Sequence, residues 1–428
     1  MTKRTDSLIT VEEALQTILD KINPVDSLPL PLPQSLHRIL AETIHSETNV
    51  PPFANSAMDG YAVIAADTIN CSPERPARLK VIDNIPAGVT PSQTISPKTA
   101  ARIMTGAPMP AGADAVVRFE ATSESLESPG LSADEVLIYQ AASAGDNVRA
   151  IGEDVKIDQA ILEAGRRLRP QDIGVLAAIG QATVPVYRRP RVAILATGDE
   201  LVDIGQPLEP GKIRNSNEYT QAAMVEKYGA EAIRLGIARD TVADLTAKIR
   251  AGLAQKVDLF ITSAGVSVGD FDMVKNVLAS EGQMQFWQVA IKPGKPLAFG
   301  LLEHTQADGT QVSVPLIGLP GNPVAAMVAF EVFARPAILK LAGQNSWPKT
   351  TLRATLDEDV FNSGRRHYMR ALVYPTEEGY RVTTRGSGVQ VQGSGILTSM
   401  VWANSLVVVP EDVTQLSAGV SIEVWILD

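Results

Sequence analysis

The sequence has very little cysteine. Cys71 is the only one in 428 residues, so no disulfide can form within the chain. The four histidines show no paired spacing of metal ligands, which argues against a zinc site. No apolar run reaches the roughly 18 residues that a membrane-spanning helix needs. Residues 1–7 are polar and no apolar stretch follows them, so no signal peptide is expected. These absences predict a cytoplasmic protein.

Basic residues are in the minority, with 38 Lys and Arg against 48 Asp and Glu, and the formal net charge is −10. This balance argues against a general nucleic-acid binder, which would need a basic face. It does not exclude an anionic ligand, because charges more than about 8 Å away are largely screened and a local basic pocket can dominate. The content of 45% apolar and 20% charged residues is ordinary for a globular protein, and the length allows about three domains.

Secondary-structure patterns divide the chain into helical, β-rich and alternating stretches. A capping box opens a predicted helix over 10–22, alternating prolines predict an extended connector over 28–36, and a second helix is predicted over 36–43. Short β-rich runs between Pro, Gly and Ser clusters predict an all-β module over 51–152. After residue 347 the pattern is β again, which predicts a small barrel.

Between about 190 and 342, strands and helices alternate, which predicts a mostly parallel sheet covered by helices on both faces. The predicted fold class is therefore multidomain, with α/β and β parts. Strands are expected at 192–196, 233–236, 259–262, 285–290 and 316–318, and helices at 220–228, 242–254, 272–280 and 323–341.

Four loops follow the C-terminal ends of these strands, where open parallel sheets bind ligands. The third begins with a small-residue stretch, 263–269, that would present backbone N–H groups to an anion at a helix N-terminus. Three of the loops carry acids. Any one acid could be merely a helix N-cap, but clustered carboxylates persist mainly where they hold a hard cation such as Mg²⁺ or share a proton. The acids are Asp199 and Glu200, then Asp240, then Asp270 and Asp272.

A stiff turn with two lysines, Lys292 and Lys295, follows the predicted strand 285–290. The flanking prolines restrict the backbone and keep both ammonium groups near one strand end. The turn is either a solvated surface turn or a clamp that holds an oxyanion opposite the acidic loops. A second source of positive charge, expected to be partly exposed, is Arg365, Arg366 and Arg370.

Eight motifs stand in one order along nearly the whole chain: NSAMDGYA (55–62), RIMTGAPMPAGADAVV (102–117), GDNVRAIGEDV (145–155), TGDEL (197–201), TSAGVSVGDFD (262–272), AIKPGKP (290–296), GLPGNP (318–323) and QGSGILTSM (392–400). Singly, the first three indicate no more than turns. Together and in this order, the eight closely resemble the molybdopterin molybdenumtransferase family, which is related to the E domain of gephyrin.

The resemblance implies an elongated subunit and a homodimer whose active cleft uses both chains. It also implies a reaction in which molybdate joins the dithiolene of adenylylated molybdopterin with Mg²⁺ assistance, and AMP is released. A pathway adenylyltransferase is a possible partner, while neither nucleic acid nor membrane is expected. Four parts are implied: a molybdopterin-binding α/β domain (8–28 and 190–343), a linking and dimerisation domain (29–50 and 153–189), a β-rich domain (51–152) and a C-terminal barrel (347–428).

The resemblance also assigns site residues, motif by motif. Mg²⁺ would be held by Glu200, Asp240 and Asp272. Catalytic roles fall to the same three acids and to Asp59, Thr105 and Asp154, which would reach the cleft from the partner chain. Substrate or anion binding falls to Arg149, Ser267, Asp270, Lys292, Lys295, Pro320, Pro323, Arg370 and Ser394.

Two positions depart from the family pattern: Ala264 stands where glycine is usual, and Gln288 where a lysine can occur. If position 264 needed a positive φ, the methyl group would cost roughly 1–2 kcal/mol.

Two other functions stay open. One is the adenylyltransferase of the same pathway, whose single domain resembles 190–342 and would not need the β modules. The other is a non-catalytic scaffold of the gephyrin kind.

Overall fold

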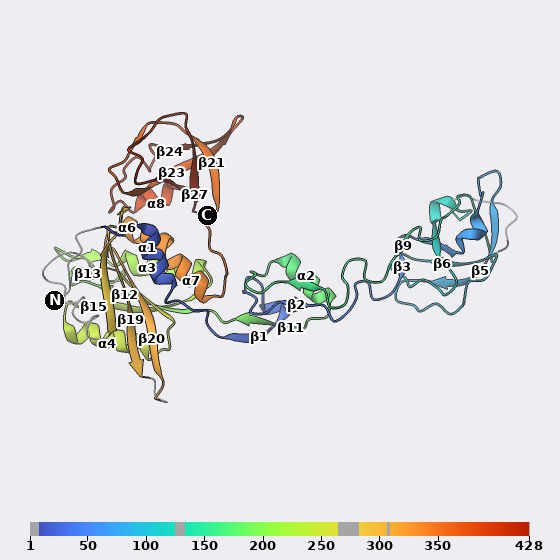
Figure 1. The fold of residues 1–428 in the computed structure, drawn as a ribbon, viewed down its shortest axis with the longest axis horizontal. Helices are drawn as coiled ribbons and strands as arrows, with labels where there is room; N and C mark the ends of the chain where they lie inside the picture. Colours follow the sequence, from blue (N-terminus) through green and yellow to red (C-terminus); the bar gives the residue numbers. More distant parts are fainter. Residues whose placement is uncertain (1–7, 125–131, 133, 264–281, 306–308, 428) are drawn as a thin grey trace.

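A six-stranded sheet forms the centre of the α/β part of the molecule (Figure 1). The computed structural model describes residues 8–124, 132, 134–263, 282–305 and 309–427. Neighbouring strands are parallel over one part of the sheet, and an antiparallel hairpin completes one edge. In order across the sheet the strands are β15 (Glu231–Ala238), β12 (Arg191–Thr197), β16 (Leu259–Ser263), β20 (Gln311–Leu319), β19 (Pro296–Thr305) and β17 (Gly282–Gln288).

Alternate residues of the central strands supply two apolar cores, one on each face of the sheet. On β12, Val192 and Ile194 belong to one core, whereas Ala193 and Leu195 belong to the other. Because both faces are covered, the strand reads as a continuous apolar run. Four helices contribute to the first core and α4 (Val242–Leu253) to the second. The four are α1 (Val11–Leu19), α3 (Ser216–Lys227), α6 (Pro323–Ala329) and α7 (Arg335–Leu341).

The strands predicted for this sheet are all present, and the helices predicted over 10–22, 220–228 and 242–254 are confirmed. The mostly parallel arrangement holds for β15, β12, β16 and β20. The sequence analysis does not predict β19, with which β17 pairs in the antiparallel direction. The helix predicted over 272–280 lies outside the described residues.

The helix predicted over 323–341 is interrupted by a π-helical turn, Phe330–Ala334, between α6 and α7. Pro336 gives the physical reason for the interruption. Proline has no N–H to donate, and its ring collides with the carbonyl one turn earlier in a regular α-helix. The wider π turn lies directly before the proline and absorbs this misfit.

Segments on both sides of the β-rich region pair with each other to form a linking unit. The predicted connector 28–36 is extended only as far as Pro31, where it pairs as strand β1. The prediction is wrong for Leu32–Gln34, which form a 3-10 turn, because a proline is tolerated in the first turn of a helix. The helix predicted over 36–43 is wrong, because Leu40 is fully buried in this unit and forms a β bridge to Val186. The unit contains β1 (Ser27–Pro31) paired with β11 (Thr183–Tyr187), β2 (Ile44–His45) paired with β10 (Ala160–Leu162), and helix α2 (Pro170–Ala178).

The β-rich region forms a five-stranded sheet of order β7-β4-β6-β5-β8 beside the short pair β3 and β9. Its described residues contain strands and 3-10 turns and no α-helix, as predicted. Gly60 is required by close packing, since a Cβ there would meet the carbonyl oxygen of Val117 at 2.0 Å. The strands are β3 (Asn55–Ser56), β4 (Gly60–Val63), β5 (Ala77–Ile85), β6 (Thr99–Ile103), β7 (Ala115–Arg118), β8 (Glu135–Ile138) and β9 (Val148–Arg149).

The C-terminal region is a closed barrel of five strands, as predicted, because β23 pairs with both β24 and β25. Lys349, just before the barrel, is buried and contacts the carboxylate of Glu331 in the π turn at 2.7 Å, which anchors the barrel to the α/β part. The barrel strands are β21 (Thr351–Leu356), β23 (Arg366–Thr376), β24 (Gly379–Thr383), β25 (Ser405–Val409) and β27 (Ser421–Ile426).

The molecule is elongated (Figure 1). The six-stranded sheet and the barrel lie at one end, the linking unit in the middle, and the β-rich unit with β3, β6 and β9 at the other end. The domain limits derived from the sequence stay predictions. Within the described residues, no helix combines the length and apolar character needed to span a membrane.

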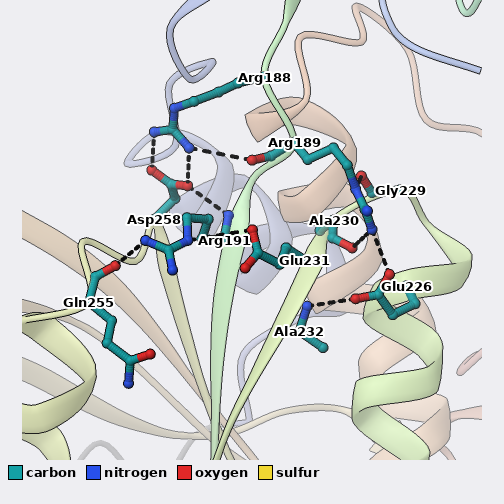
Figure 2. Close-up of polar contacts among 10 residues, drawn as sticks. All are labelled: Arg188, Arg189, Arg191, Glu226, Gly229, Ala230, Glu231, Ala232, Gln255 and Asp258. Carbon is teal, nitrogen blue, oxygen red and sulfur yellow. Dashed lines mark hydrogen bonds and ion pairs between the residues drawn. The ribbon is translucent and has the colours of Figure 1, made fainter. Parts of the chain in front are cut away.

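A carboxylate at the N-terminal edge of the sheet fixes the junction between the linking unit and the α/β part (Figure 2). Asp258 accepts hydrogen bonds from both terminal nitrogens of Arg188 at 2.6 and 2.7 Å and from the backbone N–H of Arg191 at 2.7 Å. Its side chain is only 14% exposed, whereas the nearby ion pair of Arg191 with Glu231 has side chains 34% and 50% exposed. The first pair is therefore the better shielded from solvent.

Asp258→Asn is expected to lower the free energy of unfolding by about 2 kcal/mol, because Arg188 would lose its shielded counter-charge and keep only the exposed carboxylate of Asp26, 3.8 Å away. Glu231→Gln in the same cluster is the matched control and should change the free energy by less than about 0.5 kcal/mol. Urea denaturation followed by circular dichroism measures both. Equal effects of the two substitutions would contradict this ranking.

Candidate active site

A cavity of about 900 Å³ lies between the C-terminal ends of the sheet strands and the barrel. This volume suits a small-molecule ligand. The walls come from the loops after β12, β17 and β20, from the start of α3, and from two barrel segments, around 365–367 and 392–397. Part of the predicted site lines it: Glu200, Lys292, Lys295, Pro320, Pro323 and Ser394.

Strand direction explains why these loops meet. β12, β16 and β20 are parallel, so their C-terminal ends lie at one edge of the sheet, here called the rim. β17 is antiparallel to β19, which is antiparallel to β20, so β17 also ends at the rim. The turn that carries the two lysines follows β17 and is therefore delivered to the same place as the acidic loops.

The lysine turn is also part of the barrel. Its residues Ile291–Lys292 form the short strand β18, which pairs in parallel with Arg366 and His367 of β23. The guanidinium of Arg365 adds a 3.2 Å hydrogen bond to the carbonyl oxygen of Ile291. This pairing joins the two walls of the cavity and holds the lysines between them.

The barrel loop that carries Ser394 is attached to the rim as well. The carbonyl oxygen of Ser394 accepts a 3.0 Å hydrogen bond from the backbone N–H of Val324 at the start of α6. Pro320 and Pro323 flank this contact and restrict the backbone of the loop between β20 and α6. The result is a cavity wall built from both the sheet and the barrel.

Glu200 and Asp240, two of the predicted metal ligands, lie on adjacent loops of the rim, which are joined through Asp199. The backbone N–H of Asp199 donates to the Asp240 carboxylate at 3.4 Å, and the N–H of Asp240 donates to the Asp199 carboxylate at 3.3 Å. Glu200 follows Asp199 and lines the cavity. Gly198 allows this placement, since a Cβ there would lie 2.5 Å from the Glu200 carboxylate.

The third acidic loop cannot be placed, because Ser267, Asp270 and Asp272 lie outside the described residues, as does Ala264. In the part of the chain that the structure describes, no group of three or more His, Cys, Asp or Glu side chains could hold a metal ion. The predicted magnesium triad therefore stays a prediction, with Glu200 and Asp240 on neighbouring loops.

The start of helix α3 also lines the cavity, which the sequence analysis does not predict. Asn215 is the N-cap: its side-chain oxygen accepts from the N–H of Glu218 at 3.3 Å, and its amide nitrogen donates to the Glu218 carboxylate at 2.7 Å. An N-cap asparagine marks a helix start in the sequence. Nothing in the local pattern indicates that this start faces the lysine turn.

Arg370 lies elsewhere than expected. Its side chain is fully buried and does not line the cavity. The guanidinium donates to the carbonyl oxygens of Val391 and Gly393, both at 3.0 Å, and to the hydroxyl of Ser399 at 3.1 Å. Burial lowers the pKa of Arg370 to about 10, so it stays charged at neutral pH. The geometry shows a residue that holds the loop leading to Ser394, and the expectation of partial exposure is wrong.

His367 is a cavity residue that the sequence analysis does not identify. Its side chain is only 4% exposed, and Nδ1 has no hydrogen-bond partner among the described residues. Burial, and then the positive charges of Lys292, Arg370 and Arg365, lower the pKa of His367 to about 3. The imidazole is therefore neutral at physiological pH.

Of the remaining predicted site residues, Asp59, Thr105 and Arg149 lie in the β-rich unit at the other end of the molecule, and Asp154 lies beside the core of the linking unit. Asp59 directly precedes β4, and its carboxylate accepts from the N–H of Thr105 at 2.7 Å and from its hydroxyl at 2.8 Å. These two hydrogen bonds lower the pKa of Asp59. Arg149 is in β9, and the backbone N–H of Asp154 donates to Val50. Since the β-rich unit is distant from the rim (Figure 1), one chain alone does not bring its residues into the cavity.

Family models match almost the whole chain in sequence order. The model described as the MoeA N-terminal region (domain I and II) matches residues 9–180. The probable molybdopterin binding domain matches 193–340, and the MoeA C-terminal region (domain IV) matches 353–427.

Full-length relatives and a solved structure agree with the models. The molybdopterin molybdenumtransferase of Haemophilus influenzae is 37% identical over 420 residues, which cover 97% of this chain and 98% of the relative. The Bacillus subtilis molybdopterin molybdenumtransferase is 35% identical over 421 residues, 98% of this chain and 94% of the relative. A crystal structure of the molybdopterin biosynthesis MoeA protein from Pyrococcus horikoshii has a TM-score of 0.81 and 32% identity, and the match covers 99% of this chain and 100% of that one.

Arg370→Lys is expected to lower the free energy of unfolding by about 2 kcal/mol, because an ammonium group cannot make the same set of hydrogen bonds to the carbonyls of Val391 and Gly393. Lys295→Gln, at an exposed cavity position, is the control and should change it by less than about 0.5 kcal/mol. Urea denaturation monitored by circular dichroism measures both variants. An Arg370→Lys variant as stable as the parent would show that these bonds do not support the loop.

Proposed function

The chain belongs to the MoeA family of molybdopterin molybdenumtransferases, a transferase of molybdenum cofactor biosynthesis, and we propose that it joins molybdate to adenylylated molybdopterin and releases AMP. The observation that carries this proposal is the shared cavity, where the lysine turn, Glu200 and the Ser394 loop face one another. Although the net charge of the chain is −10, the basic residues Arg214, Lys292, Lys295 and Arg365 line this cavity.

The chemistry explains the need for these basic groups. Molybdate and the phosphates of the nucleotide-bearing substrate are all anions, and they repel each other as they approach. Lys292, Lys295 and Arg365 lower this repulsion, because fixed cations in a partly closed cavity act more strongly than in bulk water. The backbone at the start of α3 adds the positive end of a helix dipole.

Glu200 has a separate role in the proposal. Its carboxylate lines the cavity and, as a hydrogen-bond acceptor, can orient a water molecule or receive its proton when the bond to AMP is broken. The lysines hold the oxyanion on the opposite wall. Attack and charge neutralisation are therefore assigned to different walls of one cavity.

A magnesium ion at the rim is part of the proposal, although of its two described carboxylates only Glu200 lines the cavity. Mg²⁺ is usually bound by one or two carboxylates together with substrate phosphates and water, and Glu200 and Asp240 supply carboxylate oxygens from adjacent loops. Asp272, the third expected ligand, lies outside the described residues. When bound, the ion would offset the negative charge of the phosphoanhydride.

A homodimer is part of the same proposal. Asp59, Thr105 and Arg149 belong to the distal end of an elongated chain and Asp154 to its linking unit, and in the proposal they serve the cavity of a second subunit. We place the reaction in the cytoplasm, with a pathway adenylyltransferase as the source of the adenylylated substrate.

The two other functions are not favoured. An adenylyltransferase of a single domain would correspond to 190–342, whereas the matches to the family models and relatives extend over both β-rich parts. A non-catalytic scaffold has no need of a cavity that joins lysines to an acidic rim.

Glu200→Gln is expected to lower the rate of AMP release about 10²-fold or more, because the amide keeps the size of the side chain but cannot accept a proton. Glu231→Gln, at the opposite edge of the same sheet, should leave the rate unchanged. The assay combines adenylylated molybdopterin, molybdate and Mg²⁺ and measures AMP by chromatography. A Glu200→Gln variant with the parental rate would remove Glu200 from the reaction.

Mixing two inactive variants tests whether the cavity uses both chains. In a dimer of one Asp59→Asn chain and one Glu200→Gln chain, one of the two sites receives only intact residues. Random exchange of subunits should therefore restore up to about a quarter of the parental AMP release, if each variant alone is inactive. The same mixture without subunit exchange is the control, and no recovery after exchange would contradict the shared site.

A further inference from the structure

One wall of the cavity carries an unusual set of side chains. Lys292 and His367 are paired residues of the parallel strands β18 and β23, and paired residues of neighbouring strands direct their side chains to the same face. Arg365 lies in the bend directly before β23, and its guanidinium donates to the carbonyl oxygen of Ile291 in β18. All three line the cavity. Two cationic groups and one imidazole thus share this wall.

The neighbouring residue Arg366 shows how successive side chains of β23 point to opposite faces. Its guanidinium faces away from this set and pairs with the carboxylates of Glu411 and Glu12. Arg366 does not line the cavity. The charge of Arg366 is therefore compensated within the protein, whereas no ion pair is seen for Lys292 or Arg365 among the described residues.

The imidazole of His367 has unused hydrogen-bonding capacity. Nδ1 is buried and has no partner among the described residues, although buried polar atoms are nearly always paired. Gln392, another cavity residue, differs in this respect: its amide accepts from the N–H of Arg370 and donates to the carbonyl oxygens of Arg370 and Val389. Nδ1 of His367 is thus not committed to any described protein group, whereas the amide of Gln392 is.

We propose that His367 is a substrate-contacting residue whose Nδ1–H donates a hydrogen bond to a tetrahedral oxyanion held by Lys292 and Arg365. This inference rests on the proposed function, because the oxyanion is either molybdate or a phosphate group of the pterin substrate. Both have oxygen atoms that accept hydrogen bonds. A ligand oxygen in this position would pair the buried nitrogen and neutralise the two cations at once.

A neutral donor is suited to this position. A third permanent cation next to Lys292 and Arg365 would add to the repulsion within the empty wall, whereas a neutral imidazole adds a directional hydrogen bond without adding charge. The low pKa of His367 agrees with this role. The residue therefore contributes to the orientation of the oxyanion more than to its attraction.

Direct binding tests the proposal in the full-length protein. Isothermal titration calorimetry measures the affinity for molybdate and, separately, for inorganic phosphate in the parent and in His367→Leu, His367→Asn and Arg366→Gln. His367→Leu should weaken binding of at least one anion about tenfold or more, since hydrogen bonds to charged groups are the strong ones. His367→Asn should stay within about threefold of the parent, because the Asn amide can place its N–H where Nδ1 stands.

The control and a spectroscopic readout separate contact from folding. Arg366→Gln, on the same strand but facing the other way, should bind as the parent does. In ¹⁵N NMR of histidine-labelled parent, one imidazole signal that is missing in His367→Leu should shift when the anion is added. A shift with molybdate alone identifies the metal oxyanion, and a shift with phosphate alone identifies the substrate phosphate.

Three results would overturn the proposal: unchanged affinities in a folded His367→Leu variant, equal losses in His367→Leu and His367→Asn, or a parent that binds neither anion. Its failure is distinct from failure of the proposed function. A parent that binds molybdate through His367 but releases no AMP would contradict the function and leave the contact intact.

Discussion

The short parallel pairing of β18 with β23 is the interaction on which the cavity depends. It joins the turn after the sheet strand β17 to a strand of the C-terminal barrel, so that two separately folded walls share one hydrogen-bonded ladder. The Ser394–Val324 hydrogen bond makes a second connection between the same walls. These contacts tie the lysine turn to the barrel, which is also held over the α/β part by the Lys349–Glu331 ion pair and by packing of Tyr368 and Leu406 in the first apolar core.

The cavity contains basic residues although the chain as a whole is acidic. It is lined by Lys292, Lys295, Arg365 and Arg214, and Glu200 is the acidic residue among the described lining. Electrostatic interactions are stronger where water is partly excluded, and distant charges are screened by salt. The cavity residues therefore act more strongly on an anion in the cavity than the net charge of the molecule does. The family to which the chain belongs handles anionic reagents, and the arrangement of charge in the cavity accounts for how that is possible in an acidic protein.

Buried polar groups support the site from outside it. Arg370 donates hydrogen bonds to backbone carbonyls of the loop before Ser394. Asp258 accepts from Arg188 at the junction below the sheet, and Lys349 forms an ion pair with Glu331 in the π turn. Each of these charged groups is paired or hydrogen-bonded within the protein, as burial requires. His367 differs from them in that it lines the cavity; its Nδ1, like Nη1 of Arg370, is buried without a hydrogen-bond partner among the described residues.

The sequence by itself determined the elements whose signal is local. Apolar runs predicted the central strands and a capping box predicted α1. Ordered motifs indicated the family and the loops that carry Glu200 and the lysines, and the alternation of strands and helices indicated the loop that carries Asp240. The sequence also predicted a helix at 36–43 that the structure lacks, because burial of Leu40 and its bridge to Val186 outweigh the local pattern. Only the tertiary structure decided that Arg370 is a buried support and that His367 faces the cavity. Both positions depend on which strand lies beside β23, and pairing between segments far apart in the chain leaves no local trace in the sequence.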